Sequence, residues 1–233
     1  MPIILSNRNT SLVEWMDKPD CDRDMLFATY RHFGLLNRIL SRWKWIYQNR
    51  IRPELEEGEK YTLLDVGFGG ADILRYLDHW SKSDGFTIDM TGIETDPRAL
   101  EYVQSQSWPE NFHFKKAALS DLLDKGNTFD FVISNHLIHH LNKEEIHQLL
   151  SNSEKICKRK ALFNDIERSD FAYFWFKILT IPFFKNSFIS DDGLLSIKRS
   201  FTFDEMRQLL PMDWKIQRIR PYRLLLEYEN SKH

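Results

Sequence analysis

The sequence predicts an α/β protein with a mostly parallel sheet, and two observations support this prediction. Short aliphatic and β-branched runs alternate with segments of helical periodicity between residues 61 and 165, a pattern typical of parallel sheets. The first run, 61–66, stops at Gly67, Gly69 and Gly70, as a buried strand does where it turns into a helix. At 233 residues, the chain is expected to form a single domain.

The elements follow in order from periodicity and capping signals. Apolar residues recur at three- and four-residue steps over 21–52, which predicts a helical N-terminal segment that Pro53 ends. Strands are expected at 61–66, 87–93, 112–116, 129–134 and 161–165. Helices are expected between them at 71–81, 97–106 and 142–155, the second opening at Pro97 and the third at a capping box of Asn142 and Glu145.

The pattern changes after residue 165. The aromatic-rich run 171–184 and a polar loop around Asp191, Asp192 and Gly193 do not fit a simple crossover, so an inserted helical lid is expected. A helix at 202–210, capped by Thr202 and Glu205, and strands at 214–219 and 223–228 close the chain. The expected parts of the domain are an N-terminal helical lid (1–58), a central core (59–165), a lid insertion (166–200) and a C-terminal helix with strands (201–233).

Composition limits the function classes. The chain is 42% hydrophobic and 28% charged, with a formal net charge of -2, so nucleic acid is not expected as a partner. The N-terminus lacks the apolar run of a signal peptide, and no run is long enough to span a membrane. Cys21 and Cys157 show neither metal-type nor disulfide spacing, so a cytoplasmic location is expected.

Two acidic residues flank the glycine turn. Asp65 precedes it, and Asp72 stands where the third glycine of the dinucleotide pattern G-x-G-x-x-G would fall when counted from Gly67. A pyrophosphate would meet a carboxylate there, whereas S-adenosylmethionine (SAM) carries an ammonium and a sulfonium group and no phosphate. The alternative is a structural turn in which Asp72 complements the helix dipole.

Glu94 ends the second expected strand. A carboxylate at this place accepts hydrogen bonds from ribose hydroxyls in dinucleotide sites. Asp96 is expected to cap the helix that begins at Pro97. The sequence therefore predicts a nucleoside site formed by the glycine turn and Glu94.

Segments 63–70, 92–97 and 129–141 resemble the class I SAM-dependent methyltransferases, in particular the branch that includes quinone-biosynthesis methyltransferases. The resemblance covers residues 61–165. It implies a Rossmann-like class I methyltransferase fold, with a seven-stranded, mostly parallel sheet and an antiparallel C-terminal strand. It also implies SAM as cofactor and S-adenosylhomocysteine (SAH) as product. Segments 164–169 and 198–206 further resemble a bacterial subgroup associated with phenolic or polyketide-type acceptors.

The resemblance also implies binding roles. Asp65 and the three glycines would line the methionine portion of SAM, Glu94 would hold the ribose, and Asn135 would begin the loop beneath the sulfonium. The family often has an Asp after the third strand for the adenine amino group, but residues 117–121 here read Ala-Ala-Leu-Ser-Asp. Backbone groups of Ala118 and Leu119 are expected to serve instead, unless a shift in register brings in Asp121. The expected cofactor-binding residues are Asp65, Gly67, Gly69, Gly70, Asp72, Glu94, Thr95, Ala118, Leu119 and Asn135.

Three histidines, His136, His139 and His140, follow the fourth expected strand. Histidine suits deprotonation of a phenol or enol, so His139 is the first candidate base and His136 the second, while His140 is expected to be structural. A structural role is the alternative for each. No metal site is expected, because adjacent His139 and His140 cannot easily face one ion. Asp165 and Arg168, at the end of the fifth strand, are expected to orient the acceptor, with surface pairing as the alternative.

The expected acceptor pocket is apolar. Aromatic residues of 171–184, including Trp175 and Phe176, would form one wall or contact a membrane surface, although core packing is an alternative. Tyr30, His32, Asn37 and Arg38 would supply the other side. The resulting hypothesis is O- or C-methylation of a small aromatic, polyketide-like or quinone-like acceptor. The alternatives are a non-catalytic SAM-binding module and an NAD-dependent oxidoreductase, which Asp72 disfavours.

Overall fold

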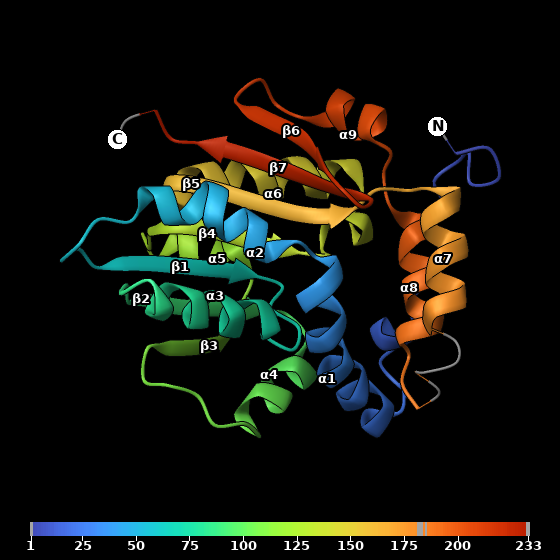
Figure 1. Cartoon of the computed structure of the whole chain (residues 1–233), viewed down its shortest axis with the longest axis horizontal. Helices are drawn as coiled ribbons and strands as arrows, with labels where there is room; N and C mark the ends of the chain where they lie inside the picture. The colour runs from blue at the N-terminus through green and yellow to red at the C-terminus, as the bar shows by residue number, and fades with distance from the viewer. Residues whose placement is uncertain (1, 181–183, 185, 232–233) are drawn as a thin grey trace.

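The computed structural model describes residues 2–180, 184 and 186–231. Within them, seven strands form one sheet in the order β3-β2-β1-β4-β5-β7-β6, with helices on both faces (Figure 1). The strands are β1 Tyr61–Val66, β2 Ile88–Glu94, β3 Phe112–Lys116, β4 Phe129–Asn135, β5 Cys157–Ile166, β6 Trp214–Ile219 and β7 Arg223–Glu229. The strands β1 to β5 pair in parallel, and β7 is antiparallel to both β5 and β6. The predicted fold class is confirmed.

The central strands are buried on both faces because helices cover both. Leu63 of β1 and Phe131 of β4 belong to one hydrophobic cluster, while their neighbours Leu64 and Val132 belong to a second. This alternation follows from the two-residue period of a strand. The helices α3 (Asp72–Ser83) and α4 (Pro97–Gln104) contribute to the first cluster, and α5 (Leu119–Asp124), α6 (Lys143–Ile156) and α9 (Phe203–Leu209) to the second.

The expected helix starts are confirmed where a local capping signal defines them. The Asn142 side chain accepts a hydrogen bond from the Glu145 N–H at the start of α6, and Thr202 does the same with Glu205 at α9. Asp96 caps α4 by accepting from the Arg98 N–H. These signals lie within one helical turn, so the sequence alone carries them.

The N-terminal helical segment is broken in the middle. The helix α1 (Arg23–Leu40) has Ser41 as its C-cap residue. The helix α2 (Trp43–Ile46) begins after Arg42, whose φ is 62°. The break is fixed by the strand ends, since the Asn164 side chain of β5 donates to the Ser41 carbonyl at 2.7 Å. It also directs the Trp43 indole N–H to Asn135 of β4, at 3.0 Å. A π-turn (Tyr47–Ile51) and a 3-10 turn (Arg52–Glu54) then lead to β1.

The segment expected to be a lid insertion contains α7 (Asp170–Thr180) and α8 (Ile189–Arg199), which lie beyond the carboxyl ends of the parallel strands (Figure 1); its role as a lid stays a prediction. The expected polar loop around Asp191 to Gly193 is wrong, because these residues form the first turns of α8. Gly193 permits close packing here, since a Cβ atom at this position would lie 2.3 Å from the ring of Phe176. Residues 181–183 of the aromatic run lie outside the described residues.

The segment before α1 packs against α8. The Asp192 carboxylate of α8 accepts the backbone N–H groups of Trp15 and Met16, at 2.6 and 3.0 Å. These contacts hold the 3-10 turn Trp15–Asp17 against α8. Phe171, Phe174 and Trp175 of α7 are more than half exposed, and membrane contact by this face stays a prediction. None of the helices in the described part of the chain meets the length and hydropathy of a membrane span.

Candidate active site

A cavity of about 830 Å³ opens at the carboxyl ends of β1, β2 and β4. This is the place where the strand order reverses, and open α/β sheets bind ligands there. The cavity is lined by Glu14, Met16, Asp17, Pro19, Tyr30, Phe33, Asn37, Asp65, Gly67, Phe68, Gly69, Gly70, Asp72, Ile73, Glu94, Thr95, Asp96, Pro97, Arg98, Asn135, His136, Leu137, His139, His140, Ser196 and Arg199. Most of the residues singled out in the sequence therefore share one cavity.

The glycine turn presents bare backbone to this cavity. Gly67 and Gly69 have φ values of 77° and 51°, a region that favours glycine. The turn also lies close to α1, because a Cβ atom at Gly70 would stand 3.2 Å from the carbonyl oxygen of Tyr30. The Gly67 N–H donates to the Ile93 carbonyl at 2.9 Å, which ties the turn to β2.

Asp65 provides a buried carboxylate at the start of the turn. The residue is 2% exposed, and its Oδ1 atom has no hydrogen-bond partner among the described residues. Burial, together with the charges of Asp72 and Glu94, raises the pKa of Asp65 well above its usual range. An unpaired buried carboxylate oxygen is costly, so a cationic ligand group is the partner that fits this position.

Asp72 and Glu94 lie on the same side of the cavity. Asp72 accepts a hydrogen bond from the Asn37 side chain at 3.0 Å, and burial raises its pKa to about 6. Glu94 accepts from the N–H groups of Thr95 at 2.8 Å and Gly69 at 3.4 Å, and burial raises its pKa as well. Both carboxylate oxygens of Glu94 are thus held at the cavity wall, where further lone pairs can accept ribose hydroxyls.

Ala118 and Leu119, which were expected to contact the adenine, are not among the described residues that line the cavity. The Ala118 N–H donates to the Asp121 carboxylate at 2.8 Å, which caps α5, and the Leu119 side chain packs into the core. Asp121 is therefore committed to the helix cap.

Asn135 lies at the end of β4 and is oriented by two donors. Its Oδ1 atom accepts from Trp43 and from Asn164, each at 3.0 Å. The sequence did not indicate either donor, because both contacts depend on the break between α1 and α2.

His139 is clamped by Asp165. Its Nδ1 atom lies 2.7 Å from one Asp165 oxygen, and its backbone N–H donates to the other at 2.9 Å. Burial lowers the pKa of His139, but Asp165 and Glu14 outweigh burial and raise this pKa to about 9. Asp165 is not among the described residues that line the cavity. Its contact with the cavity is indirect, because it holds the ring and the backbone of His139.

His136 lines the cavity, but its Nε2 atom already has a hydrogen-bond partner. Its Nε2 atom is within hydrogen-bond distance of the Arg223 guanidinium, which also donates to the Leu40 carbonyl. Burial, and then the charge of Arg223, hold the pKa of His136 well below its usual range. Because the guanidinium can only donate, His136 is neutral and its Nε2 lone pair is occupied. The second candidate base is therefore blocked by a partner that the sequence did not indicate.

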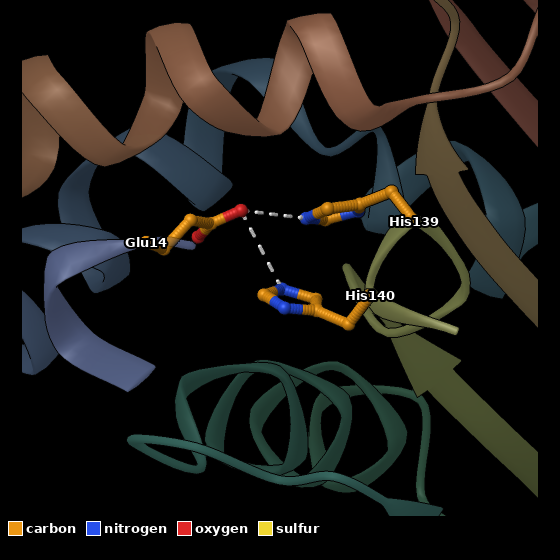
Figure 2. Close-up of side chains that lie close together, drawn as sticks. All are labelled: Glu14, His139 and His140. Carbon is orange, nitrogen blue, oxygen red and sulfur yellow. Dashed lines mark ion pairs between the residues drawn. The ribbon is translucent and has the colours of Figure 1, made fainter. Parts of the chain in front are cut away.

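Glu14, His139 and His140 form a compact group, named the Glu14 cluster below (Figure 2). The Glu14 Oε1 atom lies 3.4 Å from His139 Nε2 and 3.7 Å from His140 Nε2. His139 and His140 are adjacent and yet direct Nε2 toward the same carboxylate oxygen, in contrast to the expectation that they cannot easily face one ion. The 3-10 turn Ile138–His140 places the two rings side by side, with centroids 4.3 Å apart, and both reach the same carboxylate.

Several expected acceptor-side residues lie elsewhere. Arg168 is 2% exposed, and its guanidinium donates to the carbonyls of Leu5 and Ser200 and to Glu205, so it ties the N-terminal segment to α9 instead of orienting an acceptor. Tyr30 and Asn37 line the cavity, whereas His32 and Arg38 do not among the described residues. No described residue of 171–184 lines it either, because α8 and not α7 faces the cavity.

The chain is similar to known methyltransferases in part of its sequence and in its fold. Residues 63–160 match the sequence model of a family described as a methyltransferase domain. No curated protein sequence matches the chain. A plantazolicin methyltransferase solved with SAH has 14% identity and a TM-score of 0.64, over 93% of this chain and 92% of that one.

Two further solved structures are similar. The magnesium protoporphyrin IX methyltransferase of Synechocystis, with bound SAM, has 13% identity and a TM-score of 0.52, over 97% of this chain and 88% of that one. The human N-acetylserotonin methyltransferase, in complex with SAM, has 10% identity and a TM-score of 0.63, over 89% of this chain and 56% of that one. These likenesses confirm the Rossmann-like class I methyltransferase fold.

Proposed function

Residues 63–160 match a family described as a methyltransferase domain, and we propose that the protein is a SAM-dependent methyltransferase that methylates a small phenolic acceptor whose oxygen lies at the Glu14 cluster. The observation that carries the proposal is one cavity that is lined both by the glycine turn with Glu94 and by Glu14, His139 and His140. A cofactor and an acceptor can therefore meet within it.

The residues around the turn fit SAM. Bound SAM supplies a methyl group on a sulfonium centre. Asp65 offers the unpaired carboxylate oxygen described above, and the additional carboxylates of Asp72 and Glu94 favour a cationic nucleoside over a phosphorylated one. We assign the ribose to Glu94 with Thr95, and the region beneath the sulfonium to Asn135.

The part of the cavity around the Glu14 cluster suits a ring that carries a hydroxyl group. Met16 and Phe33 provide apolar wall, while Glu14 and His140 provide acceptor atoms for a hydroxyl hydrogen. Asp165 positions His139. The similar structures act, by their names, on plantazolicin, magnesium protoporphyrin IX and N-acetylserotonin, so the fold alone does not select the acceptor. A phenolic quinone precursor, as used by the branch that the sequence resembles, is one acceptor of the proposed kind.

Calorimetric titration tests the cofactor, and release of SAH in the presence of a panel of phenols tests the transfer. We expect SAM and SAH to bind and NAD not to bind. Binding of NAD in place of SAM would support the oxidoreductase alternative. Tight SAM binding without turnover over the whole panel would support a non-catalytic module.

The affinity for SAM should depend on pH. Asp72 has a pKa of about 6 and the pKa of Asp65 is also raised, so both carboxyls hold protons more readily than usual in the free protein. A cationic ligand binds the carboxylate forms, and affinity therefore falls as pH drops through these pKa values. Between pH 7 and pH 5, below the ligand's own amino pKa, we expect calorimetry to show SAM binding weakened by about tenfold or more.

The variant Asp72→Asn separates the contribution of Asp72 to this pH dependence from that of Asp65. It removes the group that titrates near pH 6, so its SAM affinity should change less over the same range. Circular dichroism at pH 5 checks that the protein stays folded. Equal SAM affinities at pH 5 and pH 7 in the unmodified protein would contradict this assignment.

A further inference from the structure

The two rings of the Glu14 cluster direct the same atom toward one carboxylate. His139 Nδ1 lies 2.7 Å from Asp165, and His140 Nδ1 lies 3.0 Å from Asp17. Each ring thus uses Nδ1 for a hydrogen bond to an aspartate and turns Nε2 toward Glu14 Oε1 (Figure 2). Carboxylates that hold the far nitrogen of a histidine are typical of metal-binding histidines.

The distances within the cluster are longer than those of hydrogen bonds. A charged N–H to carboxylate bond spans about 2.7–2.9 Å, whereas Glu14 Oε1 lies 3.4 Å from His139 Nε2 and 3.7 Å from His140 Nε2. Zinc bonds to nitrogen and oxygen of about 2.0–2.2 Å place the ligands of a tetrahedral site roughly 3.4 Å apart. All three ligand atoms lie within 4.8 Å of one another.

His139 supplies an independent observation. Its side chain is 1% exposed, and its Nε2 atom has no hydrogen-bond partner among the described residues. Buried polar atoms without partners are rare in proteins. The nitrogen is aimed at Glu14, with which it forms an ion pair at 3.4 Å, and at the cavity that both residues line, so a bound ion would give it the short bond that it lacks.

The surroundings hold the cluster in this arrangement. Arg8 and Arg199 donate to the carbonyl oxygens of the histidine turn, including that of His139, and Ser196 donates to Glu14 Oε1 at 2.9 Å. Three carboxylates, of Glu14, Asp17 and Asp165, face the two histidines and offset the charges of the two guanidinium groups and of the His139 ring. A metal ion that binds Nε2 of His139 displaces its proton, so the ion takes the place of a charge that these carboxylates already balance.

We propose that Glu14, His139 and His140 bind one divalent transition-metal ion, with zinc as the probe, and that its open coordination position takes the acceptor oxygen. Three protein ligands and one open position are typical of catalytic zinc sites. Such an ion lowers the pKa of a bound hydroxyl and orients its oxygen. The role toward the acceptor rests on the proposed function, whereas binding of the ion does not.

Zinc binding is measured by calorimetry on chelator-treated protein without a polyhistidine tag. We expect one Zn²⁺ per chain, and weakening by at least about 100-fold in Glu14→Gln and in His140→Asn. Asparagine places its amide nitrogen near the position of Nδ1 and so keeps a donor for Asp17. His147→Asn, on the exposed face of α6, is the matched control and should bind zinc as the unmodified protein does. Thermal unfolding of each variant checks folding.

Several outcomes would overturn the proposal. Absence of saturable binding, or equal affinity in Glu14→Gln, His140→Asn and the unmodified protein, would remove the site. Full turnover by metal-free protein, with none gained on adding Zn²⁺, Mn²⁺ or Co²⁺, would remove the role toward the acceptor. SAM titration of the metal-free protein is a separate measurement, and loss of SAM binding there would contradict the methyltransferase assignment instead.

Discussion

Replacing Gly67 by valine is expected to abolish SAM binding. Gly67 has a φ of 77°, which a β-branched residue adopts only at a cost of about 1–3 kcal/mol. The new side chain would also start 3.4 Å from Leu137, which lines the same cavity. Either the turn moves or the side chain occupies space at the cofactor end. We expect calorimetry to show at least about a 100-fold loss of affinity, equivalent to about 2.7 kcal/mol.

Gly58→Val is the matched control for this prediction. Gly58 has a similar φ of 84°, but a Cβ atom there would meet nothing within 4 Å, and Gly58 does not line the cavity among the described residues. The control therefore introduces comparable backbone strain away from the site and should keep its affinity for SAM. If Gly67→Val bound SAM within about threefold of the unmodified protein, the turn would not be the cofactor site.

The grouping of the glycine turn, Asp72 and Glu94 around one cavity could be predicted from the sequence because its signals are local. The strand β1, the glycine turn and Asp72 lie within 61–72, and Glu94 ends the neighbouring strand β2. Parallel pairing of β1 with β2 then brings these groups together without further information. The capping boxes of α6 and α9 were predictable for the same reason.

The surroundings of Glu14 and His136 could not be predicted, because they depend on contacts between distant segments. Glu14 belongs to a stretch without periodicity, and Asp192, far away in α8, fixes the neighbouring residues Trp15 and Met16. Arg223 reaches His136 from β7, the last strand. The sequence contains these residues, but no spacing rule connects them. The conformation of the turn that carries His139 and His140 could not be predicted for a related reason, since Arg8 and Arg199 from distant segments donate to its carbonyl oxygens.

Replacing His139 by asparagine should leave SAM binding intact and lower turnover by about 10²–10⁴, the range typical of a lost catalytic group. Asparagine keeps a donor near the position of Nδ1, so it can still satisfy the buried Asp165 carboxylate, but it removes Nε2 from the Glu14 cluster. Alanine is less informative, because it leaves Asp165 as an unpaired buried charge, which costs about 3–5 kcal/mol.

Two measurements distinguish a catalytic role of His139 from a structural one. Calorimetry should give the same SAM affinity for His139→Asn and the unmodified protein, because His139 is not among the groups assigned to the cofactor. The rate of SAH release at saturating acceptor should fall, which means that kcat decreases. Unchanged kcat with normal folding would exclude His139 from the chemistry, and because Nε2 is the atom removed, the acceptor oxygen would then have to lie elsewhere in the cavity.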